Sequence, residues 1–337
     1  MELNLHSGGH VTFKSNWEKS DSQHQLKSAV VEKMVQLAYP DNKLISQQVI
    51  GGGCANLNVK IQLEHSNNPL ILRIYLRDKT SAEREQKLGL LLKQNLLVPA
   101  THFIGDYKDY HFAITEFMPG ITLRDLLLSN TPHDMAAIMF EVGKVLSEIT
   151  QHTFPMAGFF DKDLNVIDPI TNDDFNTFAI DCLKDKIVIS QIDANTISKI
   201  SYNLNKYSNL FPDENDKHLV HADFDPANIL VDNVEGEWKI TGILDWEFAF
   251  SGSVLCDVAN MLRYAHHMPA EYEEAFLGGL KSSGIALPAN WRISVHMLNM
   301  LSLLDCLKRS DPKNRPNQCA DICALINHIL KDLKAIQ

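Results

Sequence analysis

Apolar and polar positions divide the chain into a strand-rich first part and a mainly helical second part. The first 25 residues are polar, rich in Ser, Asn, Gln and His, and predict a loose arm. A helical period follows, with Leu26, Val30, Met34 and Leu37 on one face of a helix over 26–38. The pattern then alternates with a period of two, which predicts strands. We expect strands at 44–50, 57–63, 70–75, 102–106 and 111–116, with one helix at 80–94.

A helical period dominates the remainder of the chain. We expect helices over 122–129, 133–151, 173–188 and 195–209, two short strands over 229–231 and 238–244, and further helices from residue 254 onward. A small sheet-rich lobe followed by a larger helical lobe is a two-lobed α+β architecture. We therefore divide the chain into a flexible arm at 1–25, an N-lobe at 26–118 and a C-lobe at 119–337.

Composition limits the classes of partner. Lys and Arg number 31 and Asp and Glu number 42, so the net charge is −11. This charge would repel the phosphates of a nucleic acid. No apolar run approaches the ~18 residues of a membrane span, and the first residues lack the apolar core of a signal peptide. We expect a cytoplasmic protein that binds a small molecule; nothing in the sequence specifies its oligomeric state.

The strongest chemical signal is a His-x-Asp-x-x-x-x-Asn motif formed by His221, Asp223 and Asn228, which leads from a loop into a strand. An aspartate can accept a hydroxyl proton, and the asparagine can turn back to offer a neutral oxygen to a hard cation. Asp245 ends the returning strand and so lies beside this loop. Separately, these residues could be a loop aspartate and a strand-end cap. Together they favour a catalytic and metal-binding pair.

Two weaker signals precede this motif. Gly51, Gly52 and Gly53 stand between two predicted strands, where glycines let backbone N–H groups approach phosphates, although a plain hairpin has the same composition. Arg73 is a lone cation in an apolar strand and needs a partner, which Glu83 or Glu85 can supply. This arginine is either a structural ion-pair partner or a phosphate clamp. The strand that ends near residue 116 could form a hinge whose backbone binds a base.

The order of these features along the chain resembles that of the protein-kinase-like fold. The glycine run comes first, followed by the cation on a strand, the glutamate on a helix, the hinge and the two acidic motifs. The segments HADFDPANILV and ILDWE resemble the aminoglycoside phosphotransferase branch, whose members are small-molecule kinases. The resemblance spans residues 45–265. Ala222 stands where protein kinases have Arg, which argues against regulation by phosphorylation of an activation loop. Ser253 replaces a common Asp or Asn, and we expect Asp257 to tie the following helix to the catalytic loop.

The resemblance implies a role for each candidate residue. Asp223 would be the catalytic base that positions the substrate hydroxyl, and Asn228 and Asp245 would hold Mg²⁺. Arg73 would contact the ATP phosphates and pair with Glu85, with Glu83 as the second choice. The other nucleotide contacts would come from Gly52, Gly53, Asn56 and the backbone of Glu116 and Met118, which would hold adenine.

These assignments predict an ATP- and Mg²⁺-dependent phosphotransferase that acts on a hydroxyl of a small molecule. A cationic acceptor such as an aminoglycoside would suit the acidic chain, since carboxylates concentrate ammonium groups. A choline- or homoserine-type metabolite kinase and a kinase-shaped nucleotide-binding module without activity are the alternatives. Two acidic clusters in the helical lobe could line the acceptor site, although such faces are usually solvated surface. They are Asp161, Asp163, Asp168, Asp173 and Asp174, and Glu271, Glu273 and Glu274.

Overall fold

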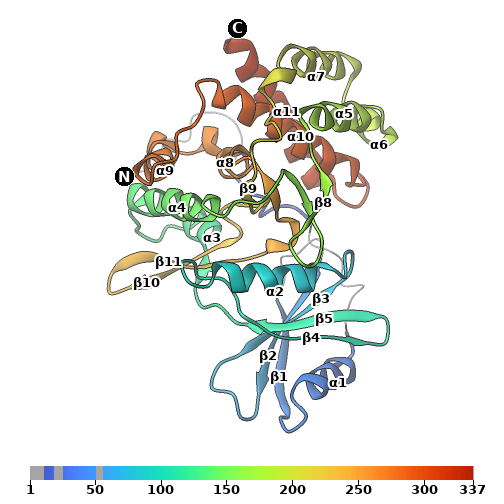
Figure 1. Cartoon of the computed structure of the whole chain (residues 1–337), viewed down its shortest axis with the longest axis vertical. Coiled ribbons are helices and arrows are strands. Elements are labelled where there is room, and N and C mark those ends of the chain that lie inside the picture. The colour runs from blue at the N-terminus through green and yellow to red at the C-terminus, as the bar shows by residue number, and fades with distance from the viewer. Residues whose placement is uncertain (1–10, 19–25, 51–55, 337) are drawn as a thin grey trace.

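The chain folds into the two expected lobes, a sheet-rich N-lobe and a larger helical C-lobe (Figure 1). This computed structural model describes residues 11–18, 26–50 and 56–336. Gly52 and Gly53, predicted as nucleotide contacts, lie outside the described residues. The α+β architecture predicted from the sequence is confirmed.

The N-lobe is built on a five-stranded antiparallel sheet with the order β1-β2-β3-β5-β4. Its strands are β1 (Leu44–Ile50), β2 (Asn56–Leu63), β3 (Leu70–Tyr75), β4 (Thr101–Tyr107) and β5 (Tyr110–Glu116). Helix α1 (Ser28–Ala38) buries Val31, Met34 and Val35 in a cluster with apolar residues of this sheet. The second helix, α2 (Ser81–Leu92), lies between the sheet and the C-lobe (Figure 1).

Helix α2 joins the two lobes. Its apolar Leu88 and Leu92 belong to the core cluster of the C-lobe. On the same helix, the buried Arg84 donates Nη2 to the backbone oxygen of Glu247 at 2.7 Å and Nη1 to that of Phe160 at 3.4 Å. Because a buried guanidinium is costly to leave unpaired, these bonds fix how α2, and with it Glu85, faces the C-lobe.

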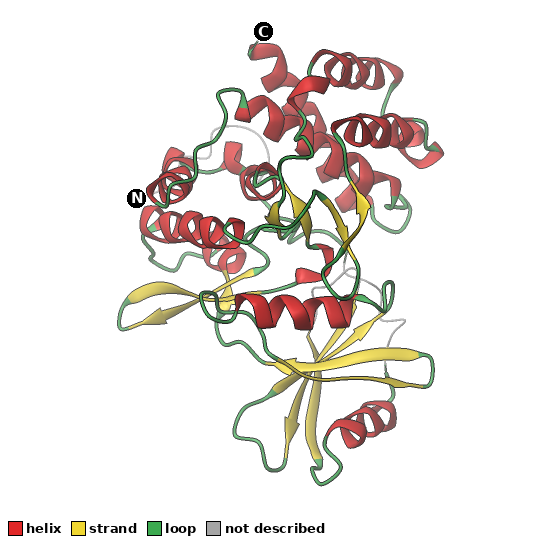
Figure 2. Cartoon of the chain, viewed as in Figure 1, coloured by secondary structure: helices red, strands yellow, loops and turns green. Residues whose placement is uncertain are grey.

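The C-lobe is mainly helical, with two small sheets near the junction of the lobes (Figure 2). The α-helices are α3 (Leu123–Leu128), α4 (Met135–Thr150), α5 (Asn172–Leu183), α6 (Lys186–Gln191), α7 (Ala194–Lys206), α8 (Leu255–Leu262), α9 (Ala270–Ser282), α10 (Trp291–Lys308) and α11 (Pro316–Ala335). Three 3₁₀ turns are η2 (Ser208–Leu210), η3 (Trp246–Phe248) and η4 (Ala265–His267). One sheet joins β11 (Glu237–Ile243), β10 (Ile229–Val234) and β6 (Ile121–Thr122); the other has the order β8 (Val166–Pro169), β7 (Gly158–Phe160), β12 (Phe250–Gly252) and β9 (His218–Val220).

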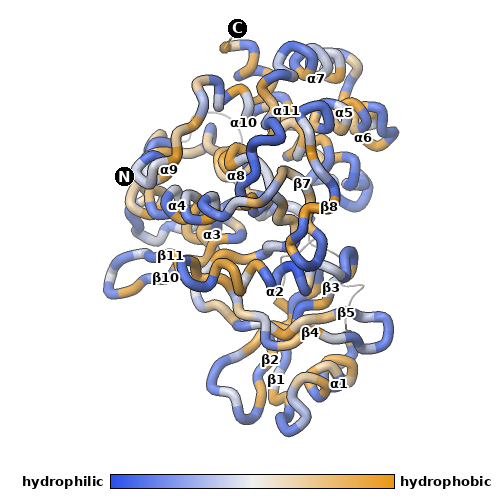
Figure 3. Tube along the Cα trace, in the orientation of Figure 1, coloured by the Kyte–Doolittle hydropathy of each residue, from blue (hydrophilic) through white to orange (hydrophobic). Residues whose placement is uncertain are grey.

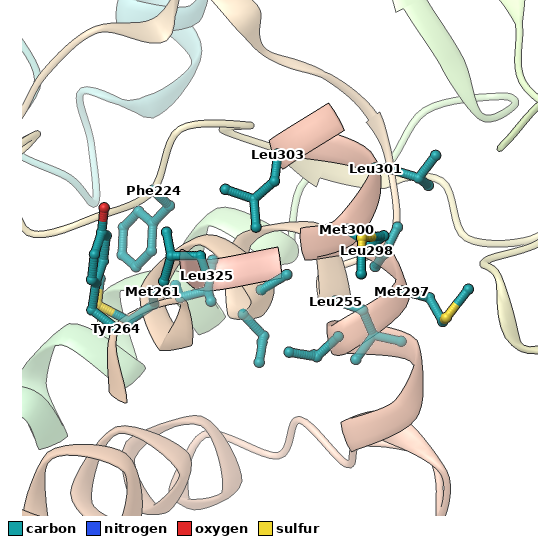
Figure 4. Close-up of a cluster of buried hydrophobic side chains, with 14 of the residues drawn as sticks. Phe224, Leu255, Met261, Tyr264, Met297, Leu298, Met300, Leu301, Leu303 and Leu325 are labelled. Atoms are coloured by element: carbon teal, nitrogen blue, oxygen red, sulfur yellow. The ribbon is translucent and has the colours of Figure 1, made fainter. Parts of the chain in front are cut away.

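The C-lobe core lies directly beneath the predicted catalytic loop. Phe224, the residue after Asp223, is fully buried in a cluster with Met261 and Tyr264 and with the apolar side of α10 (Figure 4). Hydrophobic and hydrophilic positions alternate along helices such as α4, which bury one side only (Figure 3). The hydrophobic effect therefore anchors the loop through the buried Phe224.

Three sequence expectations need correction. The helix expected over 173–188 is divided into α5 and α6, because Asp185 caps a new helix by accepting the backbone N–H of Ile187. Strands β7, β8, β9 and β12 were not predicted, since three or four residues are too few to show alternation. Residues 11–18 are packed against the C-lobe rather than loose, and Phe13 is only 2% exposed. Within the described residues, no helix is long and apolar enough to span a membrane.

Candidate active site

The loop that follows β9 carries the His-x-Asp motif and is held by α8. Asp257 accepts hydrogen bonds from the backbone N–H groups of His221 at 2.8 Å and Ala222 at 2.9 Å. Asn260, one turn later, donates to the backbone oxygen of Ala222 at 2.8 Å. Burial raises the pKa of Asp257 to about 6, although the hydrogen bonds from these backbone N–H groups act to lower it. The expected tie between Asp257 and the catalytic loop is confirmed.

Asp223 lies at the centre of the site, with both carboxylate oxygens engaged. Asn228 donates its amide nitrogen to Asp223 Oδ2 at 2.9 Å, and Lys14 Nζ lies 3.0 Å from Oδ1. Burial alone would raise the pKa of Asp223, but the charge and hydrogen bond of Lys14, with a smaller effect from the charge of Arg263, hold it below its usual value. Asp223 is therefore ionised at neutral pH, as an acceptor of a hydroxyl hydrogen bond must be.

Asp245 stands where β11 ends, in the left-handed conformation with φ of +68°. The backbone N–H of Leu244 donates to the backbone oxygen of Asn228 at 2.8 Å, which brings Asp245 beside Asn228. The amide nitrogen of Asn228 is bonded to Asp223, so the oxygen is the only atom of this side chain that can serve as a cation ligand. Two oxygen ligands suit Mg²⁺, which completes its shell with phosphates and water. Among the described residues, no three His, Cys, Asp or Glu side chains form a self-contained metal cage.

Arg73 on β3 reaches the same place from the N-lobe. Its Nη2 lies 2.5 Å from Asp245 Oδ1, 3.3 Å from Glu85 Oε1 and 3.7 Å from Glu247 Oε2. Of the two glutamates considered from the sequence, Glu85 is the one beside Arg73, whereas Glu83 lies 3.6 Å from His111 Nε2.

Glu247, next to Asp245 in the chain segment ILDWE, was not assigned a role from the sequence. Burial and the nearby charge of Asp245 raise its pKa to about 7. Asn56, the last residue of the glycine run, donates Nδ2 to Glu247 Oε2 at 2.6 Å. The Asn56 side chain therefore joins the N-lobe to this segment of the C-lobe, which spacing along the sequence did not indicate.

A cavity of about 230 Å³ between the lobes is lined by Arg73, Glu116, Met118 and Asp245, together with apolar residues such as Leu230. The backbone N–H of Glu116 donates to the oxygen of Ala100 at 2.8 Å, so this N–H is not available to a ligand. The cavity thus has an apolar, hinge-lined end and a charged end, as a purine nucleotide requires.

A second cavity of about 440 Å³ begins at Asp223, Asn228 and Asp245 and extends to the C-terminal end of α10. Asp245 lines both cavities and so marks where they meet, whereas Asp223 and Asn228 line the second cavity close to this point. A larger cavity of about 990 Å³ lies beside α4 and β11, and none of the predicted site residues lines it.

The N-terminal segment 11–18 forms one wall of the second cavity, which sequence reasoning missed. Phe13 packs against Tyr264 with ring centres 5.4 Å apart, and Trp17 donates Nε1 to Asp321 at 2.7 Å. Glu18 accepts the backbone N–H of Asn317 at 2.8 Å. Between these anchors, Lys14 contacts both Asp223 and Asp225. The apolar Val11, Phe13 and Trp17 within a polar stretch were the available signal.

The acidic clusters that favoured a cationic acceptor do not line this cavity. Asp163 lies 2.9 Å from Lys87 on the N-lobe, and Glu273 pairs with Arg292. Both clusters therefore belong to the surface, and this ground for a cationic acceptor is lost.

Comparison with known proteins agrees with the geometry. Residues 46–292 match the phosphotransferase enzyme family, so the chain belongs to that family of small-molecule kinases. A thermostable variant of aminoglycoside phosphotransferase APH(4)-Ia, in a ternary complex with AMP-PNP and hygromycin B, has a similar structure. Its TM-score is 0.67 at 19% sequence identity, with 90% of this chain and 98% of that chain covered. No curated protein sequence matches the chain.

Two further structures are also similar. APH(2")-IIia in complex with GDP and kanamycin gives a TM-score of 0.68 at 15% identity, with 89% of this chain and 98% of that chain covered. Macrolide 2'-phosphotransferase MphH from Brachybacterium faecium gives 0.62 at 16% identity, with 88% and 97% covered. At these identities the likeness establishes the fold, and the acceptor has to be argued from the residues of this chain.

Proposed function

We propose that the protein transfers the γ-phosphate of ATP, in the presence of Mg²⁺, to a hydroxyl of a small molecule. The observation that carries the proposal is the position of Asp223, Asn228 and Asp245 at or close to the meeting point of two cavities. One cavity has the apolar and hinge-lined form of a nucleotide site, and the other has room for an acceptor. Phosphoryl transfer needs this arrangement, because its catalysis rests on positioning and charge neutralisation.

In this proposal Asp223 accepts the hydrogen bond of the acceptor hydroxyl, orients its oxygen toward the γ-phosphate and takes its proton. Asn228 and Asp245 hold Mg²⁺, which neutralises charge on the phosphates. Arg73, fixed by Glu85 at 3.3 Å, contributes a second positive charge at the phosphates. The carbonyl of Glu116 and the backbone N–H of Met118 bind the purine.

One contact favours a second candidate, a nucleotide-binding module with little or no transfer. Lys14 is bonded to Asp223 and Asp225, so it holds the predicted base in an ion pair. A chain that kept Lys14 there while nucleotide bound would not activate an acceptor. The two candidates differ in ADP release, which only the first one predicts.

The test measures thermal stability with MgATP or MgGTP, then ADP release with a panel of kanamycin, hygromycin B, choline, homoserine and sugar acceptors. Nucleotide at 100 times its Kd should stabilise the fold by about 2.7 kcal/mol. Asp223→Asn should keep this shift and lower turnover by about 10² or more, because the base is lost. Asp232→Asn, at an exposed position on β10, is the matched control. Wild-type turnover in Asp223→Asn would contradict the proposed role.

A further inference from the structure

The far end of the acceptor cavity is lined by arginines. Arg263 directly follows α8, Arg309 follows α10 and Arg315 precedes α11, and all three line the cavity that contains Asp223. Three separate elements therefore bring guanidinium groups to one wall. Such a wall is the reverse of the carboxylate-lined site that an aminoglycoside would favour.

The carboxylates at this end already have partners. Asp305 pairs with Arg309, and Glu18 accepts the backbone N–H groups of Asn317 at 2.8 Å and Gln318 at 3.2 Å. Lys14 occupies the remaining acidic position, at Asp223 and Asp225. An ammonium group of an acceptor would have to displace one of these partners before it could form an ion pair.

Arg263, in contrast, has no acidic partner among the residues that the structure describes. It is 6% exposed, and its hydrogen bonds go to neutral oxygens of Asn299 at 3.0 Å, Asn260 at 2.6 Å and Ser302 at 3.0 Å. Its charge acts on Asp223 without a direct ion pair, and Lys14 already pairs with that carboxylate. An anionic ligand would therefore supply the direct counter-charge that the buried guanidinium lacks. Arg315 is half-buried; it bonds to the amide oxygen of Gln318 at 3.3 Å and makes no ion pair within the described ranges, although its charge acts on Glu18 nearby.

Arg263 is also linked to the catalytic loop. Asn260 accepts from Arg263 through its side-chain oxygen and donates through its nitrogen to the backbone of Ala222, next to Asp223. A group bound at Arg263 would therefore be held at a fixed place relative to the predicted base. This is the geometry of a specificity contact, because it positions one part of a substrate while another part reacts.

We infer that the acceptor carries an anionic group, a carboxylate or a phosphate ester, which Arg263 and Arg315 bind while its hydroxyl faces Asp223. The inference rests on the proposed phosphotransferase activity and adds the chemical class of its substrate. Guanidinium groups suit both anions, since their paired N–H donors match two oxygens.

A matched series of ligands tests the inference. Sorbitol, D-gluconate, sorbitol 6-phosphate and glucamine share a polyol chain and differ at one end, which is neutral, carboxylate, phosphate or ammonium. Binding is measured by calorimetry on the full chain with saturating Mg-AMP-PNP, so that anions cannot occupy the nucleotide phosphate site. We expect gluconate or sorbitol 6-phosphate to bind about tenfold or more tightly than sorbitol or glucamine. The comparison of the two anions separates a carboxylate from a phosphate substrate.

Variants assign the binding to the arginine wall. Arg315→Gln, and separately Arg263→Lys, which keeps the buried charge, should each weaken anion binding about tenfold without changing AMP-PNP affinity. Arg292→Gln, at an exposed arginine on α10 that pairs with Glu273 of α9, is the control and should bind as the wild type does. The inference is wrong if neither anion binds, if glucamine or kanamycin binds more tightly than both anions, or if the preference for anions survives both variants.

These results are distinguishable from a failure of the proposed function. ADP release with amine or neutral acceptors alone would keep the phosphotransferase and remove the anionic substrate. Absence of AMP-PNP binding would remove the phosphotransferase, while the ligand series measured without nucleotide would still show whether Arg263 and Arg315 select anions.

Discussion

Lys14 and Asn228 compete with any acceptor for the same carboxylate, that of Asp223. Asn228 donates its amide nitrogen to Oδ2, a contact that the motif did not predict, whereas Lys14 contacts Oδ1 from a segment more than 200 positions earlier in the chain. Despite its burial, the two aspartates raise the pKa of Lys14 above its usual value, so it stays charged. For an acceptor hydroxyl to reach Oδ1, Lys14 must move aside or share that oxygen.

Replacing Lys14 by methionine should therefore change the pH dependence of transfer. The charge of Lys14 lowers the pKa of Asp223, so its removal raises that pKa and moves the acidic limb of the kcat/KM profile to higher pH. The pH–rate profile of Lys14→Met measures the shift, with Lys281→Met on the exposed side of α9 as the control. An unchanged acidic limb would show that Lys14 does not govern the ionisation of the base.

At the scale of elements, the strands that carry the chemistry were the most predictable part. The bounds of β1 and β3 agree with the alternation in the sequence, and Asp245 follows the end of β11 close to Asn228, although the strand ends at Ile243 rather than at the expected residue 244. The short strands and the packed segment 11–18 could not be predicted in the same way. Their stability comes from partners distant in sequence, such as Tyr264 against Phe13, and a local pattern does not contain that information.

The contact between α4 and α9 gives a prediction at this scale. A Cβ on Gly143 would meet the backbone oxygen of Phe276 at 2.1 Å, and one on Gly279 would meet that of Phe140 at 2.0 Å. Gly143→Ala should therefore push the helices apart and destabilise the fold by about 1–3 kcal/mol or more, although alanine favours a helix.

Chemical denaturation of Gly143→Ala measures this loss. Gly278→Ala is the control, because a Cβ there would meet its nearest atom, on the Phe140 ring, at 3.6 Å, an ordinary contact. Equal stability of the two variants would show that the helices do not depend on their close approach.

At the scale of the molecule, the two lobes meet through buried polar contacts as well as through the apolar residues of α2. Arg73, Arg84 and Asn56 each extend from the N-lobe to η3 or the residue before it. The resemblance predicted that Arg73 and Asp245 belong to one nucleotide site, but the contact between them was not predicted. The sequence did not predict the arginine wall, since Arg263, Arg309 and Arg315 lie in segments without a motif and meet only through the packing of α8, α10 and α11.

That packing also brings four histidines together at the opposite side of α11. His266 stacks on His328 with ring centres 3.6 Å apart, and His328 Nε2 lies 3.0 Å from Asp332. His296 Nε2 is 3.8 Å from the same carboxylate, and His267 lies against His266. Burial is the main cause that lowers the pKa of His266 and His267, and repulsion from the neighbouring rings adds to it. Burial also lowers the pKa of His296 and His328, although the nearby carboxylate of Asp332 acts to raise it.

This cluster should make the fold less stable in mild acid. A histidine whose pKa is lowered by folding takes up a proton more readily when the chain is unfolded. The folded state therefore keeps its full stability above the ordinary histidine pKa near 6.5 and loses stability as the pH falls below that value. Buried carboxyls such as Glu247, with a raised pKa, act in the opposite direction. A variant therefore separates the effect of the histidines on stability from that of the carboxyls. Between pH 7.5 and 5.5, the Tm of His328→Gln should fall less than that of the wild type. The control is His65→Gln, at an exposed position after β2, whose Tm should fall as much as that of the wild type. If the Tm of His328→Gln also falls as much as that of the wild type, the stacked histidines do not resist protonation.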